Sequence, residues 1–364
     1  MTEQNKKICI LVEQLGKGGA ERSAGLLTQM FSEMGYEVHL ATITGLIEYP
    51  YQAKLFNMGV YKNEANDIFN KIKRFRLFKK YLDKEKIDVV LDFRFRQNYW
   101  KEWLIDTFLY PSVKVIHMVQ SYHIAYYLPP NKKSTIRLFS KAFNINTLTE
   151  GIKERIEEEY GLKNVSVIPN PVDLENIKKE ALKPFTYTKP YIVAAGRMDE
   201  DLKQFDKLII AYAKTQLPQV GVQLRILGRG KLVEDYKQLA ESLGVGEDVI
   251  FEGFQPNPYP WFKNALFFVL CSKFEGHPRV LIESLACGTP VISMDCKTGP
   301  REIIEHEKNG ILIPDGDFLK LREQIDRLYE DKNLLEKLSA NSVQSVTHFS
   351  MEEIAKEWRE LLNS

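Results

Sequence analysis

The chain has 364 residues, of which 44% are hydrophobic and 27% charged, a composition typical of a soluble globular protein with material for about two domains. Its formal net charge is +1, but residues 1–170 contain 25 Lys and Arg against 19 Asp and Glu, whereas residues 171–364 contain 25 against 30. The composition excludes a largely disordered chain, and the positive first half fits either an anionic partner or a scatter of solvated lysines.

The four cysteines, Cys9, Cys271, Cys287 and Cys296, lie in or beside apolar stretches and form no C-x-x-C pair. We therefore expect them to be reduced and buried, which favours the cytoplasm. No segment reaches the ~20 apolar residues of a membrane span, and the N-terminus lacks a signal-peptide pattern. Any contact with a membrane is expected to be peripheral, at its inner face.

Short apolar runs alternate with segments of helical periodicity along the whole chain, a pattern typical of parallel sheets covered by helices. Strands are predicted at 7–13, 37–43, 88–93, 113–119 and 144–149 in the first half, and at 191–196, 223–228, 249–254, 266–272 and 290–295 in the second. Two series of five predict an α/β protein with two doubly wound domains. Ligands of such sheets bind at the carboxyl ends of the strands, so the expected site is the cleft between the domains.

The first strand is followed by GKGGAER at 16–22, which leads into an amphipathic helix ending at Gly35. Glycines at Gly18 and Gly19 would let the backbone and the helix N-terminus approach a ligand closely. The spacing is not G-x-G-x-x-G, and no acidic residue ends the second strand, so a dehydrogenase is disfavoured. A P-loop is excluded because Gly-Lys-Ser/Thr is missing.

Segment 67–82 reads DIFNKIKRFRLFKKYL and predicts a basic helix. One face would carry Ile68, Ile72, Phe75 and Leu82, and the basic residues, largely elsewhere, are Lys71, Lys73, Arg74, Arg76, Lys79 and Lys80. Such a helix fits contact with anionic lipid, and it also fits an ordinary crossover helix with a solvated face.

Segment 92–103 adds Arg94, Arg96, Trp100 and Trp103 after a strand. These side chains suit either the diphosphate and sugar rings of an acceptor or plain packing.

The stretch VIPNPVDLENIKKEALKPFTYTKP carries four prolines and predicts a linker at about 170–188, because proline breaks helices. We therefore expect an N-terminal domain at 1–170 and a C-terminal domain at 171–348. A serine N-cap followed by a glutamate at the third helical position predicts a last helix within 349–364, beginning near Met351. This helix is expected to pack back towards the N-terminal domain.

The stretch SKFEGHPRVLIESLACGTPVIS at 272–293 contains Glu275 and, after seven further residues, Glu283. Pro278 and Gly288 predict a helix over about 278–287, whose first N–H groups, near Arg279 and Val280, form an anion site. Glu283 lies in an apolar run, where a carboxylate needs a partner. A diphosphate at the helix start, a sugar near Glu275 and a ribose diol at Glu283 fit this spacing. A salt bridge of Glu283 within the domain is the alternative.

These stretches together resemble the retaining, nucleotide-sugar-dependent glycosyltransferases of family 4, which have the GT-B architecture of two Rossmann-like domains facing a central cleft. The resemblance spans nearly the whole chain in the right order. It is carried by EGHPRVLIESLACGTPVIS at 275–293, GKGGAER at 16–22, VIPNPVD at 167–173, AAGRMDEDLKQFDKLIIAYA at 194–213 and LRILGRG at 224–230.

The resemblance implies that Arg197 and Lys203 hold the donor diphosphate, a role that suits a forked guanidinium and a compact ammonium. His117 resembles the histidine that reaches the donor sugar from the N-terminal domain and is expected at the end of the strand VKVIH; a structural role is the alternative, and His123 the fallback. The implied catalytic residues are His117, Arg197, Lys203 and Glu275. The implied substrate-binding residues are Gly18, Gly19, Gly228, Phe254, Gly276, His277, Pro278, Arg279, Val280 and Glu283.

The implied reaction moves a hexose or N-acetylhexosamine, with retention, from a nucleotide sugar to a glycan or lipid-linked saccharide in surface polysaccharide synthesis. TGPREII at 298–304 resembles the branch of the family that acts with UDP-hexoses or UDP-N-acetylhexosamines on bacterial surface glycans, which implies a UDP-linked donor. The resemblance also implies that the C-terminal domain, 171–348, binds the nucleotide sugar and that the N-terminal domain, 1–170, binds the acceptor. The alternatives are a soluble acceptor, a GDP- or ADP-sugar donor, and a non-catalytic sugar-nucleotide-binding protein. We expect no cofactor, no metal and no nucleic-acid partner. The pair Asp315 and Asp317 could hold a cation, but Asp317 is better explained as a helix N-cap.

Overall fold

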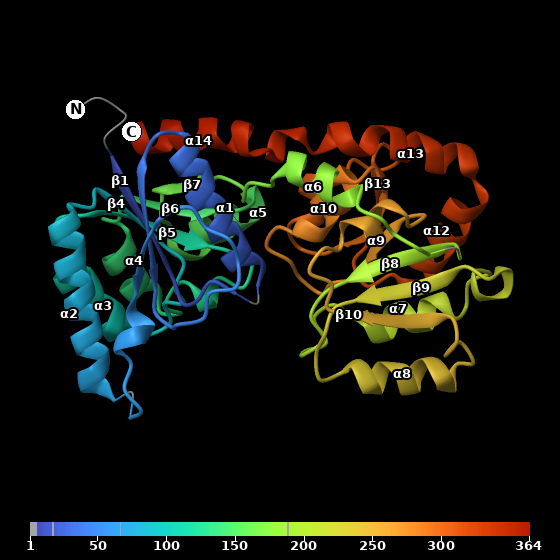
Figure 1. Cartoon of the computed structure of the whole chain (residues 1–364), viewed down its shortest axis with the longest axis horizontal. Helices are drawn as coiled ribbons and strands as arrows, with labels where there is room; N and C mark the ends of the chain where they lie inside the picture. The colour runs from blue at the N-terminus through green and yellow to red at the C-terminus, as the bar shows by residue number, and fades with distance from the viewer. Residues whose placement is uncertain (1–5, 17, 66, 188) are drawn as a thin grey trace. The chain divides into compact units, whose positions relative to one another are not determined.

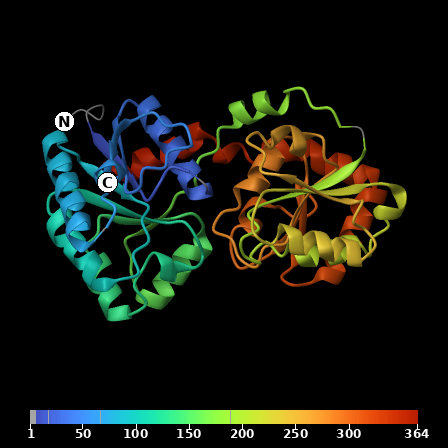
Figure 2. The same cartoon turned by 60° about the horizontal axis from the view of Figure 1, so that its bottom comes forward.

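A computed structural model describes residues 6–16, 18–65, 67–187 and 189–364. The chain divides into two compact units, one containing the chain up to Pro171 together with Met351–Ser364 (unit 1) and the other Val172–Ser350 (unit 2). Each unit is a parallel sheet with helices on both faces (Figure 1 and Figure 2). The predicted α/β class with two doubly wound sheets is confirmed.

The sheet of unit 1 has the strand order β3-β2-β1-β4-β5-β6-β7 in the described residues, and all neighbouring strands are parallel. Its strands are β1 Lys7–Val12, β2 Glu37–Thr42, β3 Lys54–Asn57, β4 Val89–Asp92, β5 Lys114–Val119, β6 Asn144–Thr147 and β7 Val165–Val167. Its α-helices are α1 Gly19–Glu33, α2 Ile68–Glu85, α3 Tyr99–Leu109, α4 Lys132–Phe139, α5 Glu150–Tyr160 and α14 Met351–Asn363. The strand order reverses between β1 and β4, which places the crevice of this sheet at the carboxyl ends of those strands.

The last helix, α14, belongs to the core of unit 1. Its buried residues Ile354, Trp358 and Leu362 share a hydrophobic cluster with α1, and the indole ring of Trp358 lies 5.4 Å from the ring of Phe31, edge to face. The opposite face of the sheet is covered by α2 and α3, which bury a separate cluster. Each face of this sheet therefore has its own apolar layer.

Unit 2 has the strand order β10-β9-β8-β11-β12-β13, again with parallel neighbours. Its strands are β8 Tyr191–Ala195, β9 Gln223–Leu227, β10 Val249–Gly253, β11 Phe268–Leu270, β12 Val291–Asp295 and β13 Gly310–Pro314. Its α-helices are α6 Leu174–Ala181, α7 Phe205–Tyr212, α8 Val233–Ser242, α9 Tyr259–Lys263, α10 Arg279–Ala286, α11 Pro300–Ile303, α12 Phe318–Glu330 and α13 Lys332–Ser345. The order reverses between β8 and β11, so the loops after these two strands flank its crevice.

The segment predicted as a linker, 170–188, contains helix α6. Its residues Leu174, Ile177 and Ala181 are buried in a core cluster of unit 2. The helix is compatible with the proline-rich composition because the four prolines of the stretch 167–190 all lie outside it.

The cysteines are unpaired and buried, as predicted. Among the described residues, the structure contains no helix with the length and apolar character needed to cross a membrane.

Candidate functional site

The loop between β8 and α7 carries Arg197 and Lys203. The Arg197 guanidinium is exposed and forms no hydrogen bond or ion pair with another described residue. The Lys203 ammonium is mostly buried and lies 2.5 Å from Oε1 of Glu275, so the loop after β8 is tied to the loop after β11. Two of the residues predicted to meet the donor are thereby brought into direct contact at the carboxyl edge of the sheet.

Backbone contacts fix the loop that carries Glu275. Its carbonyl oxygen accepts a hydrogen bond of 2.9 Å from Oγ1 of Thr298, which follows β12. Gly299 has φ +94°, and a Cβ atom there would lie 2.6 Å from Cδ of Pro278. Only glycine fits this position, since both the conformation and the space exclude a side chain. The loops after β11 and β12 are therefore packed backbone to backbone around Glu275, Gly276 and Pro278.

A second close approach joins the loops after β8 and β9. Gly228 has φ +139°, and a Cβ atom there would lie 1.9 Å from the carbonyl oxygen of Gly196. Its N–H donates to the carbonyl of Gly253 at 2.8 Å, just before Phe254, whose ring is exposed and lies 5.0 Å from the Arg229 guanidinium. Gly228 is thus required by packing, whatever ligand contact it makes.

Helix α10 begins at Arg279, one residue later than the sequence predicted, and Pro278 is its N-cap residue. Pro278 has no side-chain group that could cap this N-terminus. The first N–H groups of a helix need partners from outside the helix, and they favour an anion. The predicted anion site at Arg279 and Val280 therefore has the required backbone geometry at the edge where Lys203 and Glu275 meet.

Glu283 is buried in α10, with 3% of its surface exposed. Nη2 of Arg279, one turn earlier, lies 3.4 Å from Oε1 of Glu283. The salt bridge within the unit, which the sequence left open as the alternative, is therefore present, although the contact is long for a charge-assisted hydrogen bond. Burial, followed by the charge of Glu283, raises the pKa of the neighbouring Cys287 thiol to about 12.

His277 lies in the same loop and is buried beside Phe349, with ring centroids 4.8 Å apart. Burial, and then the positive charge of Arg279, lower its pKa to about 3, so the imidazole is neutral at pH 7. Neither ring nitrogen has a hydrogen-bond partner among the described residues. Buried side-chain nitrogens without a hydrogen-bond partner are rare in folded proteins.

In unit 1, the glycine loop leads directly into α1. Gly18 is the N-cap residue and Gly19 the first residue of the helix, so the N-cap residue has no side chain with which to cap it. Lys17, in the same GKGGAER motif, lies outside the described residues. The loop follows β1, so its position at the carboxyl edge of the sheet is the predicted one.

The prediction that His117 ends its strand is wrong. β5 continues to Val119, and His117 is buried within it, paired in register with Asp92 and packed 4.8 Å from the ring of Phe139. Burial and then the charge of Arg96 lower its pKa to about 3. The imidazole lines a cavity of about 10 Å³, roughly the size of one water molecule. These surroundings favour the structural role, whereas His123 is exposed in the loop beyond the strand.

The structure resolves the two readings of Arg94 and Arg96 in favour of packing. Both guanidinium groups are buried. Arg94 donates to Oδ2 of Asp92 at 2.6 Å and to Oε2 of Glu102 at 3.0 Å, and Arg96 donates to the carbonyl oxygens of Asp92 and Met118 at 2.8 and 2.9 Å. Burial alone would raise the pKa of Asp92, but the charges of Arg94 and Arg96 lower it to about 2. The network is an internal ion group of unit 1.

Gln120, directly after β5, was missed by the sequence analysis. Its Oε1 accepts a 2.8 Å hydrogen bond from Nδ2 of the buried Asn170, while its buried Nε2 has no partner among the described residues. The sequence signal was its position, since it is the first residue beyond the strand that was expected to end in a functional histidine.

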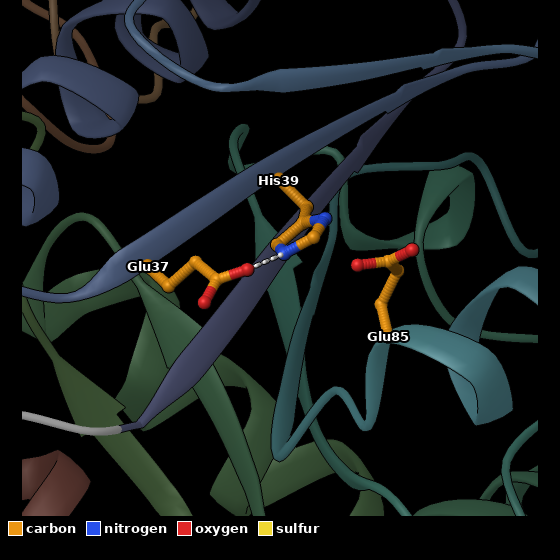
Figure 3. Close-up of side chains that lie close together, drawn as sticks. All are labelled: Glu37, His39 and Glu85. Carbon is orange, nitrogen blue, oxygen red and sulfur yellow. Dashed lines mark hydrogen bonds and ion pairs between the residues drawn. The ribbon is translucent and has the colours of Figure 1, made fainter.

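Glu37, His39 and Glu85 form a cluster with the residue types of a metal site, at the amino-terminal ends of the strands (Figure 3). Both ring nitrogens of His39 have partners, since Nδ1 lies 2.6 Å from the Tyr81 hydroxyl and Nε2 lies 3.1 Å from Oε1 of Glu37. The Lys54 ammonium, 2.7 Å from the same carboxylate, is the main reason that the pKa of Glu37 falls to about 2. The cluster is explained as a hydrogen-bonded ion group.

The other candidate cation pair is explained by capping. The carboxylate of Asp317 accepts a hydrogen bond of 2.8 Å from the N–H of Lys320 in the first turn of α12. Asp317 is therefore an N-cap, as predicted.

Comparisons with known proteins agree with this arrangement. The model of the family "Glycosyltransferase Family 4" matches residues 17–176, and the model of "Glycosyl transferases group 1" matches residues 175–345. A relative from Campylobacter jejuni, N-acetylgalactosamine-N,N'-diacetylbacillosaminyl-diphospho-undecaprenol 4-alpha-N-acetylgalactosaminyltransferase, is 30% identical over 90% of this chain and 92% of its own length.

Solved structures show the same fold at low identity. TarM of S. aureus, crystallised with Fondaparinux, alpha-GlcNAc-glycerol and UDP, is 16% identical with a TM-score of 0.79 over 99% of this chain and 100% of its own. HepE of Anabaena, crystallised with UDP and glucose, is 17% identical with a TM-score of 0.76 over 98% and 99%. Two parallel Rossmann-like units, the matching family models and the relative from C. jejuni lead to one conclusion: the chain belongs to glycosyltransferase family 4, has the GT-B fold and is a glycosyltransferase.

Proposed function

We propose that this enzyme transfers a hexose or N-acetylhexosamine from a UDP-linked donor, with retention of anomeric configuration, to a saccharide or lipid-linked saccharide in surface glycan synthesis. The observation that carries the proposal is the group formed by exposed Arg197, by the ion pair of Lys203 with Glu275, and by the uncapped start of α10. Together they offer two cations, backbone donors and one carboxylate at a single sheet edge. That combination suits a diphosphate and the hydroxyl groups of a sugar.

The Lys203–Glu275 pair suggests how donor binding prepares the site. Without a donor, each side chain neutralises the other at 2.5 Å. A diphosphate carries more negative charge than one carboxylate, so it would attract the Lys203 ammonium and leave both oxygens of Glu275 to accept hydrogen bonds from sugar hydroxyls. Arg197 and Lys203 would then stabilise the charge that grows on the departing nucleotide diphosphate, which is where preorganised cations lower the barrier most.

In this proposal Glu283 accepts hydrogen bonds from the ribose diol, and Arg279 provides its partner when no donor is bound. His277 is added as a neutral hydrogen-bonding group, because neither of its buried ring nitrogens has a partner among the described residues. The leaving diphosphate has Arg197, Lys203 and the helix start as partners, so we propose that transfer needs no divalent metal.

Three features of the relatives support the substrates. The C. jejuni relative is named for transfer of N-acetylgalactosamine to an undecaprenol-diphosphate-linked saccharide, and the TarM and HepE crystals contain UDP. A lipid-linked acceptor would require unit 1, the expected acceptor-binding unit, to reach a membrane. The remaining alternatives are a GDP- or ADP-sugar donor, a soluble acceptor, and nucleotide-sugar binding without turnover.

The test is a screen of donor hydrolysis and transfer with UDP-, GDP- and ADP-sugars, in the presence of excess chelator. We expect turnover with a UDP-sugar and a product of unchanged anomeric configuration by NMR. Binding of every nucleotide sugar without any turnover would support the non-catalytic alternative. An absolute requirement for added Mn²⁺ would contradict the assignment of Arg197 and Lys203 to the diphosphate.

A further inference from the structure

Helices α2 and α3 lie side by side on one face of the unit 1 sheet (Figure 1). Phe78 and Leu82 of α2 and Ile105 and Leu109 of α3 are buried in one core cluster with the strands. Side chains three or four residues apart share a helix face, so the residues half a turn away from this set point away from the sheet. Both helices therefore present an outer face.

The outer face of α2 combines apolar and basic side chains. Phe69 has 77% of its surface exposed, and Ile72 is also exposed. A groove of about 580 Å³ is lined by three apolar residues, Phe69, Ile72 and Leu77, and three basic ones, Lys73, Arg76 and Lys80. The basic side chains thus stand directly beside the exposed rings and alkyl groups.

The outer face of α3 is aromatic. Trp100 is 69% exposed and Phe108 64% exposed, with exposed Leu104 between them. The three residues are spaced four apart and so follow one side of the helix. The partly buried Trp103 makes edge-to-face contacts with Trp100 and Phe108, at centroid distances of 6.3 and 6.5 Å, which fix the two exposed rings in place.

This surface differs from the one that the sequence predicted. Arg74 is buried and donates to the carbonyl oxygen of Ile43 at 3.0 Å, and Lys79 is paired with Asp83, so neither is free for a partner. Leu82, predicted on the same face as Ile68 and Ile72, lies in the core. The exposed apolar residues next to α2 are instead Trp100, which the sequence connected with sugar rings or packing, and Phe108, which was not predicted to take part.

We propose that this α2–α3 surface, defined by Phe69, Lys73, Arg76, Lys80, Trp100 and Phe108, docks on an anionic lipid bilayer. Large exposed aromatic residues beside Lys and Arg match the boundary between headgroups and acyl chains, where rings enter the apolar layer and cations meet lipid phosphates. A second copy of the chain fits less well, because a two-fold contact would place the basic residues of α2 opposite the same basic residues of the other copy. Negative lipid headgroups would instead neutralise these basic residues.

The inference rests on the proposed function only in one respect: docking would bring the enzyme to the membrane that holds a lipid-linked acceptor. The docking itself does not depend on sugar transfer. It is tested by flotation with vesicles of phosphatidylcholine alone and of phosphatidylcholine with phosphatidylglycerol. We expect binding to the anionic vesicles, weakening as salt rises. Lys73→Gln/Arg76→Gln/Lys80→Gln should reduce the partition coefficient roughly 100-fold, since each basic residue near such a surface contributes about a factor of five.

Two further variants distinguish the contribution of the exposed aromatic rings from that of the basic residues. Trp100→Gln/Phe108→Gln should weaken binding to anionic vesicles at high as well as low salt, because it removes the inserted rings. The matched control Lys231→Gln/Lys332→Gln/Lys337→Gln removes the same charge from exposed lysines of unit 2 and should float like the wild type. Equal flotation of the wild type on neutral and anionic vesicles, or an equal loss in the control and the Lys73 triple variant, overturns the proposal.

Donor hydrolysis without lipid distinguishes this proposal from the proposed function. The α2–α3 variants should hydrolyse a nucleotide sugar in solution at the wild-type rate, because their substitutions lie outside the donor site. A wild-type protein that floats but never turns over a donor contradicts the proposed function alone. Sedimentation of the lipid-free protein is the last check: a dimer that dissociates in Trp100→Gln/Phe108→Gln would assign the surface to a second copy and overturn the docking on lipid.

Discussion

Each unit contains a group of paired charges beside a parallel strand, and the two groups differ in how fully the protein itself balances their charges. In unit 1, Arg94 is enclosed between Asp92 and Glu102, and all three are buried. In unit 2, Lys203 has one partner, Glu275, and Arg197 next to it in the same loop remains exposed. A buried group must be balanced by the protein itself, because an unpaired charge there costs several kcal/mol. The partly exposed group leaves positive charge for a ligand.

Residue type alone does not distinguish a structural ion group from a charged group that can bind a ligand. Arginine after a strand occurs in both units, at Arg94 and at Arg197. The distinction lies in the partners that the fold supplies, so substitutions in unit 1 should change stability and those in unit 2 should change turnover.

The largest expected effect is that of Arg94→Met. It removes the partner shared by Asp92 and Glu102 and leaves buried negative charge, so we expect the free energy of unfolding to fall by roughly 3–5 kcal/mol. Chemical denaturation followed by circular dichroism measures the change. Activity per folded molecule should be unaltered; a variant of normal stability with lowered turnover would place Arg94 in the substrate site instead.

Lys203→Ala should lower turnover and leave stability nearly unchanged. We expect kcat to fall by about 10²–10³, in the range found when one donor to a developing charge is removed, with little change in melting temperature. The control is Lys207→Ala, which removes an exposed lysine from the neighbouring helix α7. If both variants retain full turnover, the pair with Glu275 is structural.

The buried group should also make unit 1 sensitive to acid. The folded-state pKa of Asp92 is lowered to about 2, below its unfolded value, so its stabilisation is fully present above about pH 4 and is lost as the pH falls through 2. A shift of this size corresponds to about 2 kcal/mol. Denaturation of the wild type and Asp92→Asn between pH 5 and pH 2 measures it: the variant, already destabilised at pH 5, should lose less on acidification. Parallel loss in both proteins would contradict the role of Asp92.

The smallest expected effect concerns Glu283, which is buried in an ion pair and is also proposed to bind the donor. Glu283→Ala should weaken UDP binding by about 1.5 kcal/mol, the lower end of the range for a hydrogen bond to a charged group. Isothermal titration calorimetry gives the affinity, and the melting temperature provides the control. Unchanged affinity with a lower melting temperature would mean that the 3.4 Å pair with Arg279 is the whole function of this carboxylate.

Much of the fold was predictable because the central strands of parallel sheets are near-continuous apolar runs. The observed ends of these strands agree with the predicted ends to within about two residues. Two of the strands that were missed lack that signal, since β3 is an edge strand of exposed and half-buried residues and β7 has only three residues. The third, β13, is apolar, but its sequence GILIP begins with a glycine and ends in a proline, residues that are typical of turns. Helix α6 was hidden by the prolines on either side of it.

The loops of unit 2 that carry Lys203, Glu275 and the start of α10 were predictable because each follows a strand, and parallel strands place all their carboxyl ends at one edge of the sheet. The side chains of unit 1 were not. Whether Arg94 and His117 are buried depends on partners that only the folded sheet and α3 bring together, and no local pattern marks those partners.

The return of α14 to unit 1 has a consequence for biosynthesis. The ribosome completes the strands of unit 1 long before it reaches Trp358, yet that side chain fills the core beside Phe31. Domains generally fold in the order in which they emerge. Here the first unit must wait, with one apolar layer uncovered, until translation has finished the second. A nascent chain stalled anywhere before α14 will therefore leave that apolar layer exposed to solvent.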